Sequence, residues 1–207
     1  MKIFVAVPTF ENISPDTFKS IYGLDRCGHW VVFDFVRGYD CATARNNIAK
    51  QAKRENADYV LMVDSDIVLP SDALKKLLED PKDVCLGWYP HRTYGRNTGL
   101  ATMYKLGEFD YTKQYTVDEF LTLAKAGVKR EQVHGGGMGC ALIKTEVFDK
   151  IKFPFFDWVN YDNGQLLGED TFFCSRCKDA GIPVYVDPRV GCGHIFKYVQ
   201  YPNGGTK

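Results

Sequence analysis

The 207-residue sequence contains no hydrophobic run long enough to cross a membrane, and its formal net charge is zero. A membrane-spanning helix needs about 20 predominantly apolar residues, so no transmembrane segment is predicted. Balanced charge argues against a surface built mainly to bind nucleic acid or anionic lipid, although it allows a local basic groove. The first residues, MKIFVAVPTF, lead directly into a strand-like segment and lack the hydrophobic region of a signal peptide. A cytoplasmic protein is therefore expected.

The seven cysteines are scattered and odd in number, unlike the regular pattern of a disulfide-stabilised secreted domain. This pattern favours free thiols in a reducing compartment. Cys174, Cys177, Cys192 and His194 could together be read as a zinc site. However, the first two lie within one predicted helix, where they also fit as small core residues, and the spacing between Cys192 and His194 is not that of a zinc knuckle. Both interpretations stay open at this point.

Apolar segments alternate with amphipathic helices through the first ninety residues. Strands are predicted at 2–7, 30–36, 59–63 and 84–88, and helices at 14–24, 41–53 and 71–78. Continuous apolar strands between amphipathic helices indicate an α/β fold with a mainly parallel central sheet and helices on both faces. The second half is less regular, with helices predicted at 117–125 and 169–180 and a strand at 140–144. In such sheets ligands bind beyond the carboxyl ends of the strands.

Two carboxylates, Asp64 and Asp66, follow the buried strand at 59–63. Two anions this close repel each other unless a cation lies between them or one keeps its proton. Mg²⁺ or Mn²⁺ would suit these oxygen ligands, with coordination positions left for substrate phosphates. Such a cation would neutralise the charge that develops on a leaving diphosphate. The alternative is structural, because Asp66 or Ser71 could cap the helix that follows Pro70.

Arg45 lies on the apolar stripe of the helix at 41–53, where a guanidinium must find a partner. It also lies in the first turns of that helix, where the helix dipole favours an anion. A phosphate is one candidate, since arginine can bind it with two parallel hydrogen bonds. An internal salt bridge to Asp40 or Asp34 is the other, and the sequence does not decide between them.

Three further features follow in the second half of the chain. The glycine-rich segment at 135–139 would let the backbone approach a ligand closely, or could be a mobile loop. Glu169 and Asp170 open a predicted helix, where acids either cap the helix or place a carboxylate to take a proton from an acceptor hydroxyl. His194 could be a third ligand for Mn²⁺, or an ordinary surface or core histidine.

In order and approximate spacing, these motifs resemble those of the GT-A glycosyltransferases, in particular members with a family 2-like layout. The resemblance covers most of the chain. It rests on Val7-Pro8-Thr9, Ala44-Arg45-Asn46, Asp64-Ser65-Asp66, the segment from Gly136 to Phe148, Gly168-Glu169-Asp170, and His194.

The resemblance implies a GT-A fold and metal-dependent transfer of a sugar from a nucleotide-diphosphate sugar, with a UDP-sugar as the expected donor. It also implies one catalytic domain, 1–201, with a nucleotide-binding half (1–90), an acceptor-binding half (91–201) and a flexible tail (202–207). The implied roles are Asp64, Asp66 and His194 for Mn²⁺ or Mg²⁺; Pro8, Thr9, Asp34, Asp64 and Ser65 for the nucleotide; Arg45 for the diphosphate; Gly137 and Met138 beside the sugar; Asp170 as general base; and Glu169 to orient the acceptor.

Two other functions stay open. One is a nucleotidyltransferase on a related sheet, although no glycine-rich basic loop follows the first strand, and the other is a non-catalytic GT-A-like subunit. A dehydrogenase is disfavoured because no Gly-x-Gly-x-x-Gly follows the first strand. The acceptor is unidentified (a glycan, a small molecule or a modified nucleic acid), and the motifs do not separate inversion from retention. The aromatic residues of 153–161 are a candidate stacking platform or lid, and the loop at 89–132 is a candidate acceptor or homo-oligomer contact.

Overall fold

The computed structural model describes residues 1–10, 12–91, 99–107, 113–162, 164 and 166–196. The predicted tail at 202–207 and two parts of the loop at 89–132 lie outside these residues. No helix in the described part of the chain combines the length and the apolar composition that crossing a membrane requires.

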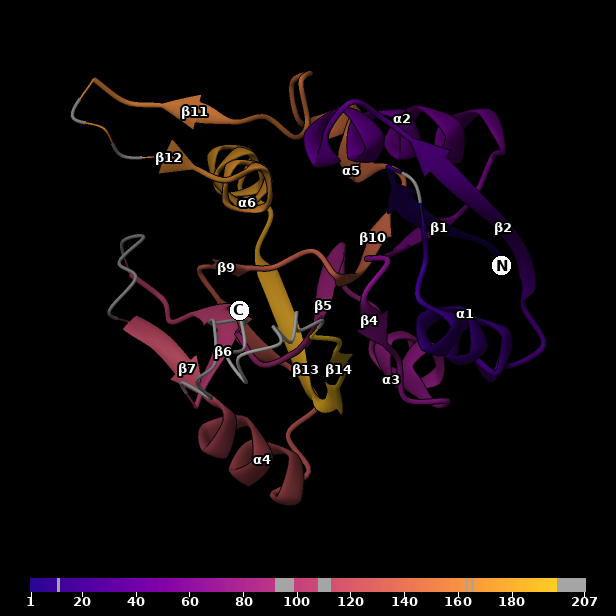
Figure 1. The fold of residues 1–207 in the computed structure, drawn as a ribbon. Coiled ribbons are helices and arrows are strands. Elements are labelled where there is room, and N and C mark those ends of the chain that lie inside the picture. Colours follow the sequence, from indigo (N-terminus) through magenta and orange to yellow (C-terminus); the bar gives the residue numbers. More distant parts are fainter. Residues whose placement is uncertain (11, 92–98, 108–112, 163, 165, 197–207) are drawn as a thin grey trace, which may run out of the picture.

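A seven-stranded sheet forms the centre of the molecule (Figure 1), in the order β2-β1-β3-β10-β5-β13-β8. The strands are β1 (Lys2–Thr9), β2 (Trp30–Arg37), β3 (Tyr59–Val63), β5 (Val84–Trp88), β8 (Glu131–Val133), β10 (Cys140–Lys144) and β13 (Val184–Gly191). Only β8 and β10 run opposite to the other strands of this sheet. The prediction of a mainly parallel sheet is therefore confirmed.

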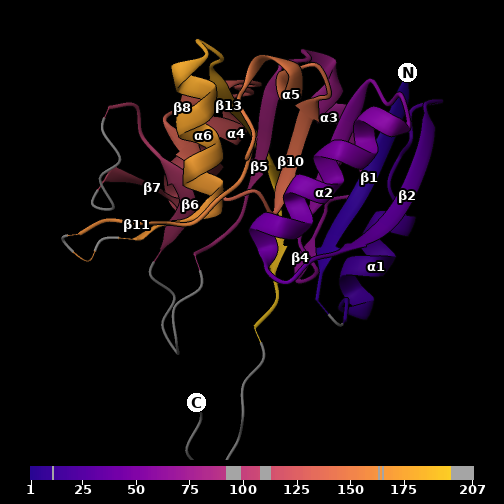
Figure 2. The ribbon, with the colours of Figure 1, turned by 90° about the horizontal axis from the view of Figure 1, so that it is seen from above.

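Helices cover both faces of the sheet, also as predicted. The helices are α1 (Pro15–Tyr22), α2 (Cys41–Arg54), α3 (Ala73–Glu79), α4 (Val117–Lys125), α5 (Val147–Lys150) and α6 (Glu169–Asp179). Apolar residues of α2, α4, α5 and α6 belong to the core on one face, and Figure 2 shows α2 and α6 in front of the sheet on this face, over different strands. Residues of α1 and α3 belong to the core on the other face. Each helix buries its apolar stripe against the apolar strands, which is why the alternation in sequence predicted the layers.

Three of the six described helices, α1, α2 and α4, begin at a capping side chain. Ser14 precedes Pro15 and accepts a hydrogen bond from the Asp16 N–H, and Asp40 caps α2 through the Thr43 N–H. The predicted cap at Ser71 is wrong: α3 begins at Ala73, and Asp72 holds the N-cap position without a side-chain hydrogen bond. Asp66 caps no helix either, since a short strand follows it.

Three small sheets complete the fold, and the sequence predicted none of them. They are β6 (Leu100–Tyr104) between β7 (Gln114–Thr116) and β9 (Gly135–Gly136), the hairpin β11 (Val159–Asn160) with β12 (Leu166–Leu167), and the pair β4 (Ile67–Val68) with β14 (Gly193–His194). The pairing of β6 with β9 requires glycine, because a Cβ on Gly136 would lie 2.8 Å from the Thr102 carbonyl oxygen.

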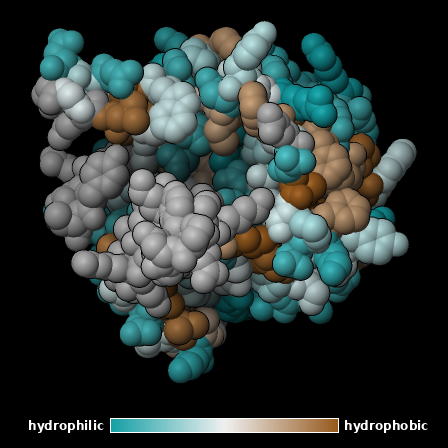
Figure 3. Space-filling model, viewed as in Figure 1, coloured by the Kyte–Doolittle hydropathy of each residue, from teal (hydrophilic) through white to brown (hydrophobic). Residues whose placement is uncertain are grey.

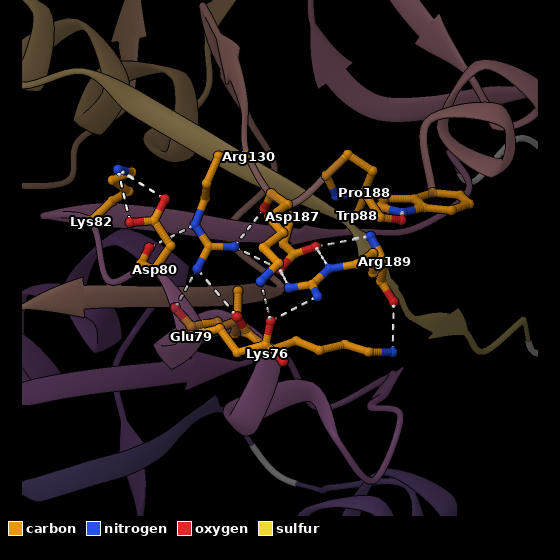
Figure 4. A network of polar contacts seen from close by, with 11 residues as sticks. Lys76, Glu79, Asp80, Lys82, Trp88, Arg130, Asp187, Pro188 and Arg189 are labelled. Atoms are coloured by element: carbon orange, nitrogen blue, oxygen red, sulfur yellow. Dashed lines mark hydrogen bonds and ion pairs between the residues drawn. The ribbon is translucent and has the colours of Figure 1, made fainter. Parts of the chain in front are cut away.

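A buried ionic network fixes an irregular stretch of β13 (Figure 4). Asp187 is fully buried and accepts hydrogen bonds from Arg130 (2.6 Å) and Arg189 (2.7 Å). Arg130 also donates to carbonyl oxygens at the end of α3, including that of Leu77 at 2.8 Å. Each charge in this network has a partner of opposite sign, which offsets the cost of burying it. Because Arg130 binds both α3 and Asp187, the network joins α3 to the segment that leads into β14.

Candidate active site

The Asp-x-Asp motif lies in the turn between β3 and β4, at the carboxyl end of a fully buried strand. The Asp64 N–H donates to the Gly139 carbonyl at 3.1 Å, which joins this turn to the glycine-rich segment. The Ser65 carbonyl accepts a hydrogen bond from the Ser14 N–H at the start of α1. The predicted nucleotide and metal residues of this motif therefore share one edge of the sheet, where ligands bind in such folds.

The pairing of β4 with β14 brings His194 to Asp66. His194 lies opposite Ile67, the Ile195 N–H donates to the Asp66 carbonyl at 2.9 Å, and His194 Nε2 lies 3.7 Å from Asp66 Oδ2. The other ring nitrogen, Nδ1, is 2.9 Å from the Pro90 carbonyl oxygen. A carbonyl only accepts hydrogen bonds, so Nδ1 carries the hydrogen, and in a neutral imidazole Nε2 then presents its lone pair toward Asp66.

This pair fits a divalent cation in its chemistry and spacing. Two ligands that each bind one ion at about 2.1 Å lie between about 3 and 4.2 Å apart, and 3.7 Å falls in this range. Carboxylate oxygen and imidazole nitrogen are acceptable ligands for Mn²⁺. In the part of the chain that the structure describes, no group of three or more His, Cys, Asp or Glu side chains is arranged to hold a metal. A cation bound between Asp66 and His194 would have two protein ligands, and substrate and water would complete its shell.

Arg45 holds the first aspartate of the motif. Only 2% of its surface is exposed, its Nη2 lies 2.8 Å and 3.1 Å from the two Asp64 carboxylate oxygens, and its Nε lies 3.5 Å from a Glu169 oxygen. Nη1 donates to the Met138 carbonyl at 3.3 Å. The internal salt bridge that the sequence allowed is thus present, but with partners other than Asp40 and Asp34. Contact with a diphosphate stays a prediction.

Glu169 and Asp170 open α6 at the same edge, next to Arg45 and Asp64. Burial, reinforced by the neighbouring Glu169 charge, raises the pKa of Asp170 to about 6. Burial also raises the pKa of Asp64, although Arg45 opposes this shift. A carboxylate that is still basic near pH 6 is suited to accepting a proton from a hydroxyl group. Figure 3 shows this face hollowed between α2 and α6, with hydrophilic atoms lining the hollow.

A second recess of about 160 Å³ lies at the ends of β1 and β2, beside the start of α2. Its lining residues are Pro8, Thr9, Phe10, Gly38, Tyr39, Asp40, Cys41 and Ala44. Two of them, Pro8 and Thr9, were predicted to lie beside the nucleotide. Asp34 is not among them, because β2 continues to Arg37 and the Asp34 carboxylate binds Gln51 on α2 at 2.6 Å. Contact between Asp34 and the nucleotide stays a prediction.

The comparison with known families agrees with this geometry. The sequence model described as "Glycosyl transferase family 2" matches residues 16–152, which is more than half of the chain. The chain belongs to glycosyl transferase family 2. No curated protein sequence matches it.

Solved structures show that this family 2 domain has the GT-A fold. A197 from STIV superposes with a TM-score of 0.63 at 19% identity, over 100% of this chain and 93% of A197. The structure of GalNAc-T7 with UDP, GalNAc and Mn²⁺ superposes with a TM-score of 0.59 at 13% identity, over 95% of this chain and 44% of that chain. A mutant of Drosophila β1,4-galactosyltransferase 7, in complex with manganese, UDP-Gal and xylobiose, superposes with a TM-score of 0.52 at 17% identity, over 95% of this chain and 72% of that chain. At these identities the likeness establishes the fold alone.

Asn46 in this family 2 domain adjoins the candidate site, and the sequence indicated no role for it. Its side chain is buried beside Arg45, donates to the Phe156 carbonyl at 2.7 Å and accepts from the Phe155 and Phe156 N–H groups at 2.9 and 3.2 Å. It therefore fixes the segment that leads to α6. The sequence feature that could have indicated this role is a polar residue next to Arg45 on the buried face of a helix, where it needs hydrogen-bond partners.

The structure corrects two predictions, those for the aromatic residues of 153–161 and for Met138. Phe155 and Phe156 are core residues, so only the more exposed members of the segment, such as Trp158 and Tyr161, can form a stacking platform. The Met138 side chain is 1% exposed, so this residue can border a donor sugar only through its backbone. Gly137 lies next to it, and its N–H donates to the Thr102 carbonyl at 2.8 Å.

The zinc alternative is wrong. Cys174 and Cys177 belong to the core on one face of the sheet, whereas Cys192 belongs to the core on the other face. The sheet separates these thiols, so the four proposed ligands cannot bind one ion. All three cysteines are instead buried apolar residues, as the helix pattern allowed.

Proposed function

We propose that the protein transfers a sugar from a nucleotide-diphosphate sugar, with a UDP-sugar as the expected donor, to an acceptor hydroxyl with the help of Mn²⁺ or Mg²⁺. The observation that carries this proposal is the Asp66–His194 pair, in which the Pro90 carbonyl fixes the histidine so that Nε2 is directed at the carboxylate. Family membership supports it, as do the UDP-sugar ligands and manganese in structures of the same fold.

Asp66 and His194 would hold the metal ion, which supplies positive charge for the donor diphosphate. The recess at the ends of β1 and β2 would take the base and ribose, because it adjoins Pro8 and Thr9 and opens at the same edge of the sheet. Asp64, which Arg45 holds, would contact the nucleotide or the ion. The backbone at Gly137 would border the donor sugar.

Asp170 would take the proton of the acceptor hydroxyl. Its raised pKa makes it a stronger base than an ordinary aspartate, and near pH 7 it is mainly ionised. Glu169 would orient the acceptor while remaining next to Arg45, which neutralises part of the negative charge in the site. These roles describe an inverting transfer; a retaining enzyme would not need Asp170 as a base.

The nucleotidyltransferase alternative predicts a different product. It would release pyrophosphate from a nucleoside triphosphate, whereas sugar transfer releases a nucleoside diphosphate. A non-catalytic subunit would release neither. The acceptor, the cytoplasmic location, the homo-oligomer and the division into halves at residue 90 stay predictions.

Thermal unfolding with a panel of nucleotide sugars tests the proposal, with Mn²⁺ or with EDTA. A ligand at 100 times its dissociation constant stabilises the folded state by about 2.7 kcal/mol. We expect one donor to raise the midpoint only when metal is present, and Asp66→Asn to remove this increase. Asp72→Asn is the control, because Asp72 forms an ion pair with Lys76 on the surface of α3. A donor-induced shift that survives EDTA or the Asp66 substitution would contradict the metal assignment, and no shift with any donor would contradict the function.

A further inference from the structure

Tyr89 directly follows β5 and lies between the glycine-rich segment and His194. It is 6% exposed, and its hydroxyl oxygen accepts a hydrogen bond from the Gly139 N–H at 3.1 Å. No motif in the sequence pointed to this residue. Its position makes it the side chain that touches both the backbone beside the predicted sugar site and the predicted metal ligand.

The glycines leave room for the hydroxyl group. A Cβ on Gly137 would overlap the Tyr89 hydroxyl oxygen, and a Cβ on Gly139 would lie 2.8 Å from it. The hydroxyl therefore fills the space that two missing side chains leave open. This contact gives the glycines a specific role: they allow the segment to close onto Tyr89.

The other side of the tyrosine supports the histidine. The rings of Tyr89 and His194 meet edge to face, with centroids 5.1 Å apart and planes at 80°. The next residue, Pro90, provides the carbonyl that receives the His194 Nδ1–H. Two consecutive residues thus fix both the position and the tautomer of the imidazole.

The surroundings keep the hydroxyl neutral. Burial raises the pKa of Tyr89 well above its ordinary value, and the charges of Asp64 and Asp170 raise it further. A neutral hydroxyl remains a hydrogen-bond acceptor for the Gly139 N–H without adding another anion to an acidic site.

We propose that Tyr89 is a positioning residue that sets the separation between the Gly137–Gly139 backbone and His194. The hydroxyl holds the glycine segment, whereas the ring holds the histidine. This inference rests on the proposed function, since the two sides that Tyr89 joins are the donor-sugar side and the metal side of the same site. The hydroxyl contact can be removed while the ring contact is kept.

Tyr89→Phe removes the hydroxyl and keeps the ring, and Tyr89→Leu removes both. Mn²⁺ binding measured by electron paramagnetic resonance reports on the histidine side. Calorimetric titration with a UDP-sugar at saturating Mn²⁺ reports on the glycine side. We expect Tyr89→Phe to weaken donor binding by about tenfold, because the Gly139 N–H loses its partner, and to leave Mn²⁺ affinity within about twofold. We expect Tyr89→Leu to weaken both by about tenfold or more.

Tyr115→Phe is the matched control, because Tyr115 is also buried and donates its hydroxyl to Glu131, away from this site. It should leave both affinities within about twofold of the original protein. Partial unfolding of Tyr89→Phe would lower both of its affinities together, and a general effect of losing a buried tyrosine hydroxyl would also appear in the control. A loss of donor affinity alone, in Tyr89→Phe alone, therefore identifies positioning.

A pair of glycine variants tests the contact independently of donor binding. Gly137→Ala should lower the unfolding midpoint, and adding Tyr89→Phe should restore part of it, because a Cβ would then lie 3.0 Å from the nearest remaining ring carbon. If the original protein binds no nucleotide sugar, the proposed function fails, while this rescue and the Mn²⁺ data still decide the contacts. If it binds a donor and Tyr89→Phe binds equally well, the inference about Tyr89 is wrong and the function stands.

Discussion

Asp170 occupies surroundings that favour its neutral form, so replacing it with asparagine should stabilise the protein at neutral pH. Its pKa rises from an ordinary value of 3.8 to about 6 on folding, mainly through burial. Each pKa unit corresponds to about 1.36 kcal/mol, and the shift of about two units therefore predicts a penalty of up to about 3 kcal/mol. Because the side chain is partly exposed, we expect about 2 kcal/mol of stabilisation in Asp170→Asn.

The pH dependence gives this prediction its sign. Below about pH 4 the carboxyl group is protonated in both the folded and the unfolded state, and the substitution should change little. Between about pH 4 and 6 the carboxyl group ionises in the unfolded state but stays mainly protonated in the folded state, which favours unfolding of the original protein, whereas asparagine has no such equilibrium. The stability gain of the variant should therefore appear between about pH 4 and 6 and then stay constant.

Urea unfolding in EDTA at pH 4, 5, 6 and 8 measures this gain. Asp157→Asn is the control, because Asp157 is exposed and accepts a hydrogen bond from the following N–H, as Asp170 does from Thr171. It should show no pH-dependent gain. A destabilised Asp170→Asn protein, or a gain that is equal at pH 4 and pH 8, would refute the reasoning. The same variant should lose transfer activity, so that stability and function would oppose each other at this position.

Three further predictions concern charges in the same fold. Arg45→Met should destabilise the protein by about 3–5 kcal/mol, because Asp64 loses its buried cation, and the deficit in urea unfolding should shrink as pH falls; a loss below about 1 kcal/mol would contradict the assignment. Asp187→Asn should lower the midpoint in calorimetry by roughly 6–12 °C, since two arginines lose their shared carboxylate and about 3 kcal/mol; an unchanged midpoint would show that the network is dispensable. Transfer or donor hydrolysis should slow by about tenfold per pH unit below about pH 6, where Asp170 becomes protonated; a flat profile down to pH 4.5 would exclude it as the base.

The sequence predicted the central layers because their signals are local. The strands at 59–63 and 84–88 are continuous apolar runs, and α2 has an apolar stripe and a capping aspartate, so both element type and burial follow from neighbouring residues. The glycosyltransferase fold followed from the order of several motifs.

The parts that the sequence did not predict depend on distant partners. The strands β4 and β14 have two residues each, which is too short for any periodicity, yet their pairing creates the Asp66–His194 contact. The partners of Arg45 were ambiguous because a buried guanidinium requires an anion without specifying which one. Tyr89 and Asn46 act through hydrogen bonds to distant backbone groups, and the sequence does not show which groups those are.

The pairing of β4 with β14 also determines when the site can exist. Asp66 lies in the first third of the chain and His194 in the last described strand. During synthesis the histidine is therefore added only after the whole segment between the two residues. Two short strands give this contact little stability of its own, and local opening should separate them more readily than the central sheet. A cation bound by both residues would stabilise the β4–β14 pairing, because it binds only when the two strands are paired and so lowers the population in which they are apart. Pairing of β14 with β4 and binding of the metal ion would then be coupled in one equilibrium.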